Sequence, residues 1–275
     1  MYISSRANPT VKLLASLSQK KHRDERGLFL LEGDKLVGEA LERCEIVYLA
    51  VREDRSDLTE RAEAYASSHP ACQLLILSLE CFDKISTEKA PQGIAAAVRY
   101  LDSCRAYTVI DEDRFPIDTF GPTLFLDGLQ DPGNVGAILR SAAAFGITDV
   151  VLSADSADLY HPRTLRASMG ALFLVRTHVV EDLAEAVRLF RLTGRSVYAA
   201  MLSPGAAPLG RLPLSLRDGL IVGNEGHGIS PVVACEATGE VYIPMVGNTE
   251  SLNASVAASV LIWELTRTLR EGEAK

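Results

Sequence analysis

The 275-residue sequence has no long hydrophobic run, no closely spaced cysteine pair and no excess of positive charge. Its longest apolar stretches, such as residues 94–98, fall far short of the roughly 20 residues that a membrane-spanning helix needs. The first residues lack the apolar core and small-residue cleavage site of a secretory signal. The sequence therefore predicts a protein that neither spans a membrane nor carries such a signal.

The cysteines are odd in number, widely scattered and never spaced as Cys-x-x-Cys: Cys44, Cys72, Cys81, Cys104 and Cys235. Such thiols are typical of a reducing cytoplasm and do not suggest a disulfide framework. The five histidines are equally dispersed, and no His/Cys pair has the spacing of zinc ligands. We therefore expect a cytoplasmic protein without a metal site.

Acidic residues outnumber basic ones by 36 to 28, which gives a formal net charge of −8. This balance argues against a protein that coats nucleic acid indiscriminately, because such proteins need a large positive field. The charge is uneven, however: residues 1–26 hold six basic and two acidic residues, a local balance of +4. One interpretation is an RNA contact through Lys12, Lys20, Lys21 and Arg23. The alternative is a solvated helix face.

Short apolar runs alternate with helical patterns along the whole chain, which predicts an α/β fold. We expect a small α/β domain over residues 1–105, a linker over 106–122 that is rich in charge and proline, and a second α/β domain over 123–275. Near the start, Thr10 is expected to cap a short amphipathic helix that runs into a basic turn over residues 19–26.

The second domain repeats the alternation more strongly. Strands are expected at residues 124–126, 150–153, 172–175, 197–200, 220–223 and 241–244. Helices are expected at residues 134–145, 183–192 and 252–269. This alternation predicts a parallel sheet covered by helices, with ligands at the carboxyl ends of its strands.

Three of these strand ends are rich in Gly, Asn and small polar residues: 127–140, 222–230 and 243–256. None contains a dinucleotide fingerprint or a phosphate-loop lysine. Taken singly, each has a structural explanation. The glycines at 223–228 suit a tight turn, Arg140 suits a surface position with a buried stem, and Asn253 suits a helix N-cap.

Their order and combination are more specific. The three segments contain Asn134-Val-Gly-x-x-x-Arg140-Ser-Ala, then Gly223-Asn-Glu225-Gly-x-Gly-Ile, then Ile243-Pro-Met followed by Ser251-Leu-Asn253-x-Ser-Val-Ala. Together they closely resemble motifs 1, 2 and 3 of the SpoU/TrmH family, the RNA ribose 2′-O-methyltransferases of the SPOUT class. Ile3-Ser-Ser-x-x-Asn-Pro-x-Val-Lys12, Phe29-Leu-Leu-Glu-Gly33 and Gln92-Gly-Ile94 look like the substrate-binding domain that precedes the catalytic half in many members.

The resemblance implies a small N-terminal α/β RNA-binding domain and a catalytic domain with a deep trefoil knot. It also implies S-adenosylmethionine as cofactor, held largely by backbone groups of the knot loops, and a homodimer with the site near the dimer interface. By position, three residues correspond to the cofactor contacts of the family: Gly223, Ile243 and Leu252. The residues that match the catalytic positions are Arg140, Asn134, Glu225, Ser251 and Asn253.

The implied reaction is attack of a ribose 2′-oxygen on the methyl group of a sulfonium, so the protein must mainly bind, orient and exclude water. Arg140 is the catalytic arginine by resemblance, yet deprotonating an arginine at pH 7 costs about 9 kcal/mol. Our hypothesis is that Arg140 stays cationic and grips the phosphate next to the target hydroxyl. Asn134 and Asn253 would position the ribose and this arginine. Arg163 and Arg166 would contact RNA phosphate, or else form a basic solvated turn.

The leading interpretation is thus a ribose 2′-O-methyltransferase, with ribosomal RNA favoured over transfer RNA by the appended N-terminal domain. One alternative is methylation of a transfer RNA ribose. Another is an RNA-binding or ribosome-assembly protein that keeps the fold without the activity. A third is a SPOUT enzyme that methylates a base, against which the ribose-type motifs count.

Overall fold

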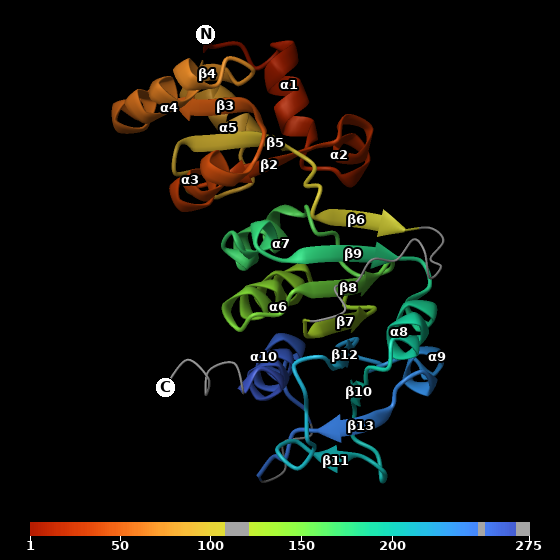
Figure 1. Ribbon diagram of the computed structural model, residues 1–275. Helices are drawn as coiled ribbons and strands as arrows, with labels where there is room; N and C mark the ends of the chain where they lie inside the picture. Colours follow the sequence, from red (N-terminus) through yellow and green to blue (C-terminus); the bar gives the residue numbers. More distant parts are fainter. Residues whose placement is uncertain (108–120, 247–250, 268–275) are drawn as a thin grey trace, which may run out of the picture.

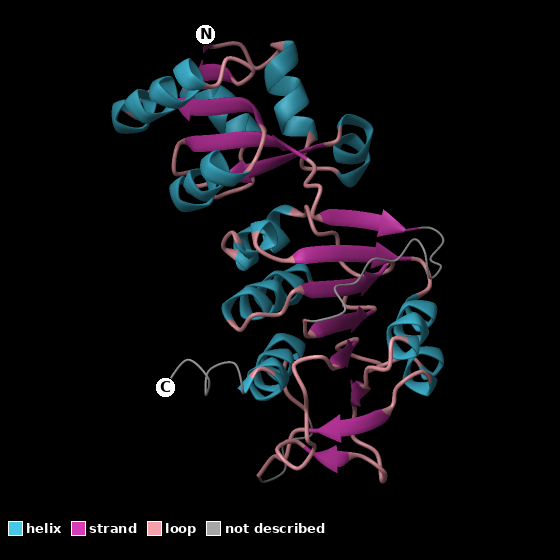
Figure 2. Cartoon of the chain, viewed as in Figure 1, coloured by secondary structure: helices cyan, strands magenta, loops and turns pink. Residues whose placement is uncertain are grey.

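The computed structural model describes residues 1–107, 121–246 and 251–267. Two α/β units follow one another along the chain, each with helices against its own sheet (Figure 1, Figure 2). Parts of the expected linker (residues 108–120) and the end of the expected last helix (residues 268 and 269) lie outside the described residues.

The N-terminal sheet is mixed and has five strands in the order β1-β4-β3-β5-β2, with β5 antiparallel to both neighbours. The strands are β1 (Tyr2–Ile3), β2 (Leu28–Glu32), β3 (Ile46–Arg52), β4 (Gln73–Leu77) and β5 (Ile94–Arg99). Helices cover both faces of this sheet: α1 (Pro9–Ser16), α2 (Lys20–Arg26), α3 (Asp34–Arg43), α4 (Ser56–Ser68) and α5 (Leu79–Ile85). Because both faces are covered, neighbouring residues of β5 such as Ala95 and Ala96 are both buried.

The second sheet has eight strands, all parallel, in the order β11-β13-β10-β12-β7-β8-β9-β6. Its strands are β6 (Cys104–Tyr107), β7 (Thr123–Asp127), β8 (Asp149–Ser153), β9 (Arg176–Val180), β10 (Val197–Ala200), β11 (Ala207–Pro208), β12 (Gly219–Gly223) and β13 (Gly239–Tyr242). β6 spans the expected boundary at residues 105 and 106 and joins this sheet by pairing with β9.

Helices α6 (Pro132–Ala144), α7 (Pro162–Ser168) and α10 (Ala254–Leu265) lie on one face of the second sheet. Helices α8 (Leu183–Leu192) and α9 (Pro231–Cys235) lie on the other face (Figure 1). The sheet is therefore buried on both sides, which explains why its central strands are continuous apolar runs. Strands β7, β8 and β9 follow one another toward one edge of the sheet, whereas the later strands β10 and β12 lie on the other side of β7. The strand order therefore reverses between β7 and β12.

The two units meet at α2, β2 and α7. Tyr100 stacks on Tyr160 with ring centroids 4.2 Å apart, and Phe29 lies 4.5 Å from the same ring. Tyr160 also accepts a hydrogen bond from the Leu101 N–H at 2.9 Å. Burial is the main reason that the pKa of Tyr160 is raised. This junction is therefore a packed aromatic contact.

Several local expectations were wrong. Residues 172–175 form no strand: Gly170 has φ 85, the turn η1 (Ala171–Phe173) follows it, and the strand begins only at Arg176. A short apolar run does not by itself distinguish a strand from a turn whose side chains enter the core. The basic segment after Gln19 is the helix α2, ended by Gly27 at φ 61, and the N-cap of α1 is Asn8 in place of Thr10.

No helix in the described part of the chain is both long and apolar enough to cross a bilayer. All five cysteines are free thiols.

Candidate functional site

A cleft of about 720 Å³ lies at the carboxyl ends of β7, β8 and β12, where the strand order of the sheet reverses. Open parallel sheets bind their ligands at such switch points. The cleft is lined by the segments that follow these strands, and its walls include Asp127, Gly128, Asp155, Asn224 and Glu225. Two of the three motif segments therefore meet there.

The segment after β12 folds back tightly on its own strand. Asn224 and Gly228 exchange two backbone hydrogen bonds of 2.9 and 3.0 Å. A Cβ atom on Gly223 would lie 2.3 Å from the Gly228 carbonyl carbon and 2.3 Å from the Ile229 nitrogen. The turn therefore requires glycine at position 223. The side-chain amide of Asn224 links the turn to the first motif segment by donating to the Gly128 carbonyl at 2.6 Å.

Asn134 and Glu225 join the first and second motifs. Asn134 lies in the first turn of α6 and is buried, and its Nδ2 donates to Oε1 of Glu225 at 2.9 Å. The N-cap of α6 is Asp131, whose Oδ1 accepts the Asn134 N–H at 2.9 Å. In a capping box the side chain of the third residue would return to the N-cap N–H. Here Glu225 accepts that N–H at 3.4 Å, which frees the Asn134 amide for other contacts.

Asn253 brings the third motif to the same place. Its Nδ2 donates to Oδ1 of Asn134 at 3.0 Å, and its Oδ1 caps α10 by accepting the Ser255 N–H at 2.9 Å. A backbone N–H can only donate and a carboxylate only accept, so this chain of contacts fixes the orientation of both amides. Each Nδ2 group donates one of its two hydrogens to these contacts: Asn134 donates to Glu225 and Asn253 donates to Asn134. The second hydrogen of each amide is left for a ligand.

Glu225 ends this chain as a carboxylate. Burial raises the pKa of Glu225, but the hydrogen bonds from Asn134 and from the Gln130 and Asp131 amides outweigh that effect and lower it. Glu225 is thus held ionised at neutral pH. Its two oxygens accept three hydrogen bonds, from the Gln130 N–H, the Asp131 N–H and Asn134 Nδ2, so Glu225 anchors the loop before α6.

The structure does not bring Arg140 into this chain of contacts. Arg140 is exposed and makes no hydrogen bond or ion pair with the residues that the structure describes. It lies about 9 Å along the α6 axis from Asn134, at 1.5 Å per residue. Its neighbour Ser141 bonds Ser259 of α10 at 2.7 Å, so Arg140 lies beside the seam between the two helices. Ser251 is exposed as well.

The three residues that match cofactor contacts lie at one edge of the sheet. Gly223 ends β12, Ile243 follows β13, and Leu252 precedes α10. Parallel strands bring their carboxyl ends to the same edge. Large apolar side chains are exposed after β10, after β13 and before α10: Leu202 (76%), Met245 (37%), Val246 (99%) and Leu252 (37%). Apolar side chains of this kind fit an adenine ring and a thioether chain, and the backbone around Gly223 offers polar groups beside them.

The basic residues near the N-terminus fall into two groups, exposed lysines and one buried arginine. Lys12, Lys20 and Lys21 are exposed, and the last two pair with Asp24 and Glu25 one turn further along α2. Arg23 is 1% exposed, pairs with Asp158 of the second unit and donates to the Leu17 carbonyl at 2.8 Å. The expectation of an RNA contact at Arg23 does not fit this placement, because its guanidinium is enclosed between the two units.

The two arginines of α7 are also engaged with protein. Arg163 NH1 lies 3.0 Å from Asp131 Oδ2, and Arg166 NH1 lies 2.5 Å from Glu88 Oε1. Both remain partly exposed, at 59% and 41% of the side chain. The segment forms the helix α7 in place of the expected basic turn, and each arginine contacts a carboxylate of another element.

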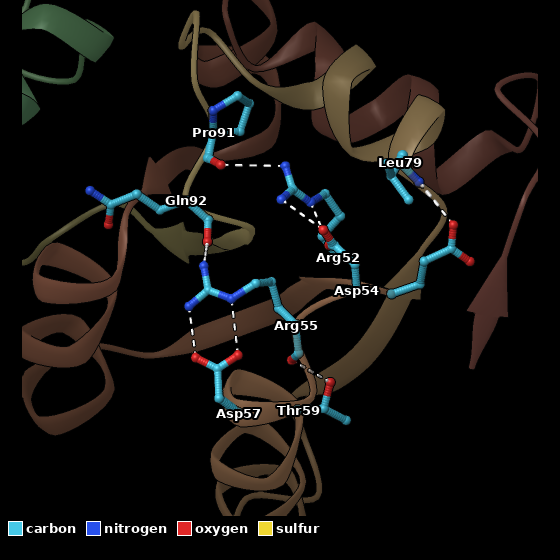
Figure 3. A network of polar contacts seen from close by, with 9 residues as sticks. Arg52, Asp54, Arg55, Asp57, Thr59, Leu79, Pro91 and Gln92 are labelled. Carbon is cyan, nitrogen blue, oxygen red and sulfur yellow. Dashed lines mark hydrogen bonds and ion pairs between the residues drawn. The ribbon is translucent and has the colours of Figure 1, made fainter.

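The N-terminal unit holds its own loop before β5 in place with two arginines (Figure 3). Arg52 grips Asp54 at 2.6 and 3.0 Å and donates to the Pro91 carbonyl, while Arg55 grips Asp57 at 2.9 and 2.7 Å and donates to the Gln92 carbonyl. The Gln92 side chain then accepts the first N–H of α3, from Asp34, at 2.8 Å. The Gln92 side chain thus caps α3 from the loop before β5.

Sequence reasoning missed Asp131, which caps α6, orders Asn134 and pairs with Arg163. The local signal was present, because Asp-Pro directly before a helical pattern is typical of an N-cap followed by proline at the first helical position. No cluster of His, Cys, Asp and Glu suited to a metal ion occurs in residues 1–107, 121–246 or 251–267.

Residues 121–263 match the model of the SpoU rRNA Methylase family, and residues 8–96 match that of the MRM3-like substrate binding domain. The 23S rRNA (guanosine(2553)-2′-O)-methyltransferase RlmP of Bacillus subtilis is 33% identical over 263 residues, which cover 96% of this chain and 98% of that protein. The structure of an AdoMet-bound rRNA methyltransferase from Sinorhizobium meliloti superposes with a TM-score of 0.83 at 28% identity, over 98% of each chain. A further RNA 2′-O ribose methyltransferase structure is 31% identical, with a TM-score of 0.80 over 98% of this chain and 100% of that one.

Proposed function

This chain belongs to the SpoU rRNA methylase family, and from that premise we propose that it transfers a methyl group from S-adenosylmethionine to a ribose 2′-hydroxyl of RNA. One observation carries the proposal: the contact chain Glu225–Asn134–Asn253 takes one residue from each of the three motifs. Residues separated by 91 and 119 positions form one hydrogen-bonded unit, which supports a shared chemical role.

In this proposal the amides of Asn134 and Asn253 hold the target ribose. Each has one Nδ2 hydrogen left after the contacts within the chain, so the pair can donate to neighbouring ribose oxygens. The Glu225 carboxylate keeps both amides turned in that direction, because it accepts only. Fixing the hydroxyl in line with the methyl group converts an encounter of two molecules into a step within one complex.

Arg140 supplies the positive charge. It is exposed and uncommitted among the described residues, so it is free to bind a phosphate next to the target ribose. A guanidinium bound there stabilises the negative charge that develops on the 2′-oxygen as its proton leaves to solvent. Ser251, which precedes Asn253 by two residues, is the fifth member of the proposed site.

S-adenosylmethionine, when bound, supplies an activated methyl group on a sulfonium. The residues proposed to hold it are Gly223, Ile243 and Leu252, at the apolar edge after β12 and β13. The bound S-adenosylmethionine in the Sinorhizobium meliloti relative supports the same cofactor here. We also propose the trefoil knot of SPOUT proteins for this half of the chain.

We assign the two units separate tasks: residues 1–105 bind RNA, residues 106–122 connect, and residues 123–275 carry out catalysis. The match of residues 8–96 to a substrate-binding domain supports this division. Lys12, Lys20 and Lys21 are exposed cations of this unit and form the proposed path for the RNA backbone.

A homodimer is the proposed assembly. α10 is mostly apolar, and its residues Val256, Val260 and Trp263 are 49%, 37% and 49% exposed along one stripe. A second copy on this stripe would bury it and enclose the neighbouring Arg140. Sedimentation equilibrium tests this: we expect a dimer for the wild type and a monomer for Val260→Asp, and a monomeric wild type contradicts it.

Ribosomal RNA in the cytoplasm is the proposed substrate, and the name of the Bacillus subtilis relative points to a guanosine. The proposal that the protein binds RNA without catalysis is tested by titration calorimetry with S-adenosylmethionine. Measurable affinity, reduced by Leu252→Asp, supports the enzyme. No affinity in the wild type would favour the non-catalytic alternative.

A further inference from the structure

Arg163 belongs to the first turn of α7, but its side chain contacts the first turn of α6. Its NH1 lies 3.0 Å from Oδ2 of Asp131. The other oxygen of this carboxylate, Oδ1, accepts the Asn134 N–H at 2.9 Å. Both oxygens of Asp131 are therefore committed, one to the helix that carries Asn134 and one to the guanidinium.

Gly133 provides the space for this contact. A Cβ atom there would lie 3.1 and 3.2 Å from Nε and NH2 of Arg163, and 2.8 Å from Oδ1 of Asp131. A side chain at position 133 would displace the arginine or the capping carboxylate. The guanidinium thus lies directly against the backbone of α6.

Close packing of α7 against α6 fixes the backbone that carries Arg163. One turn further along α6, a Cβ atom on Gly136 would lie 2.4 Å from the Thr164 carbonyl oxygen and 3.0 Å from the Ser168 nitrogen, so the two helices touch through their backbones. The start of α7 is capped by His161, whose Nδ1 accepts the Arg163 N–H at 3.1 Å.

The position is electrostatically unusual. The N-terminal turns of α6 and α7 both carry partial positive charge, which disfavours a cation beside them. The Asp131 carboxylate offsets this by standing between the two helix starts. An exposed ion pair contributes little to stability, so its value here is the orientation that it imposes.

We infer that Arg163 is a positioning residue, which holds Asp131 and through it the Asn134 amide in the orientation that meets Glu225 and Asn253. This inference rests on the proposed function. Glu225 holds Asp131 from the other side by accepting its N–H. With Arg163 present, the N-cap residue is fixed from both sides, and Asn134 follows it by three positions on the same turn.

The test measures methyl transfer from labelled S-adenosylmethionine to ribosomal RNA isolated from cells that lack this protein, at several RNA and salt concentrations. Arg163→Gln removes the ion pair. Asp131→Asn also removes it but keeps an oxygen that can cap α6. Arg163→Lys restores a positive charge near Oδ2. The matched control is Arg188→Gln, which removes a similarly exposed ion pair with Glu185 on α8, across the sheet.

We expect kcat to fall about tenfold in Arg163→Gln and in Asp131→Asn, with KM for RNA and the salt slope unchanged, because displacing a positioned group slows chemistry more than binding. The double variant should be no slower than either single one, and Arg163→Lys should recover most of the rate. If Arg163→Gln does not fold, Asp131→Asn carries the test.

A raised KM with a smaller salt slope and unchanged kcat would make Arg163 an RNA phosphate contact and overturn the inference. An unchanged rate in Asp131→Asn would also overturn it. If the wild-type protein itself transfers no methyl group, the proposed function fails and the inference fails with it. Normal transfer by the wild type and by all variants overturns the inference alone.

Discussion

The Nδ2 atom of Asn253 lies 3.0 Å from Oδ1 of Asn134, which ties the start of α10 to the first turn of α6. Asn253 also caps α10 through its Oδ1. One side chain therefore has two separable tasks: it starts a helix with its oxygen and orients Asn134 with its nitrogen.

The two tasks of Asn253 can be separated by substitution. Asn253→Ala loses both, so we expect about 1 kcal/mol less unfolding free energy and a loss of methyl transfer. Asn253→Asp keeps the capping oxygen but loses the donor, so its stability should exceed that of Asn253→Ala while transfer falls about tenfold or more. Denaturant unfolding and a methyl-transfer assay check both. Wild-type activity in Asn253→Asp would contradict the proposed role of its amide.

Arg140 should matter for chemistry and not for stability. It has no partner among the described residues, so Arg140→Ala should change the unfolding free energy by less than about 0.5 kcal/mol. We expect kcat to fall about 100-fold, as when a preorganised donor to a developing oxyanion is removed. Arg140→Lys should stay well below wild type, because an ammonium lacks the guanidinium fork. A fully active Arg140→Lys would contradict the phosphate-binding role.

Asp149 should make the unfolding free energy of the protein depend on pH in the acid range. Burial raises the pKa of Asp149, but hydrogen bonds from Arg176 and His178 outweigh that effect and lower it to about 2. A pKa lowered by folding contributes stability above pH 4 that is lost as the pH falls toward 2. The difference in unfolding free energy between wild type and Asp149→Asn should therefore shrink by about 2 kcal/mol over that interval. A difference that is constant with pH would contradict this assignment.

The basic segment should split into two behaviours. Lys20→Gln with Lys21→Gln should reduce the salt slope of RNA binding by about 0.7–0.9 for each lost phosphate contact, with little effect on stability. Arg23→Gln should instead lower the unfolding free energy by about 3–5 kcal/mol, because it leaves Asp158 without its buried partner. Binding curves at several salt concentrations and denaturant unfolding distinguish the two. An unchanged slope in the lysine variant would make α2 a solvated face.

Local signals predicted much of the fold. The bounds of α8 were predicted in full, since Asp182 caps it and Gly194, at φ 80, follows it. The strand expected at 172–175 failed because a four-residue apolar run carries no period. The burial of Arg23 depends on Asp158, which lies 135 positions away in the sequence. No local sequence pattern connects residues that far apart.

The candidate site, like the fold, could be predicted only in part from the sequence. The three motifs predicted that Asn134, Glu225 and Asn253 belong together, and the structure places them in one chain of contacts. Which of these side chains donates and which accepts could not be predicted, because that depends on which side-chain atoms face each other. The pairing of Arg163 with Asp131 was missed for the same reason: it joins the starts of two helices that are packed only in the folded protein.

The central claim is methylation of a ribose in ribosomal RNA. It is tested most directly by mapping 2′-O-methyl groups across ribosomal and transfer RNA from cells with this protein, without it, and with Arg140→Ala in its place. We expect one ribosomal nucleotide to lose its 2′-O-methyl group without the protein, to regain it with the wild type and to stay unmodified with Arg140→Ala. A 2′-O-methyl map that does not change, or a methylated base in place of a methylated ribose, would contradict the account.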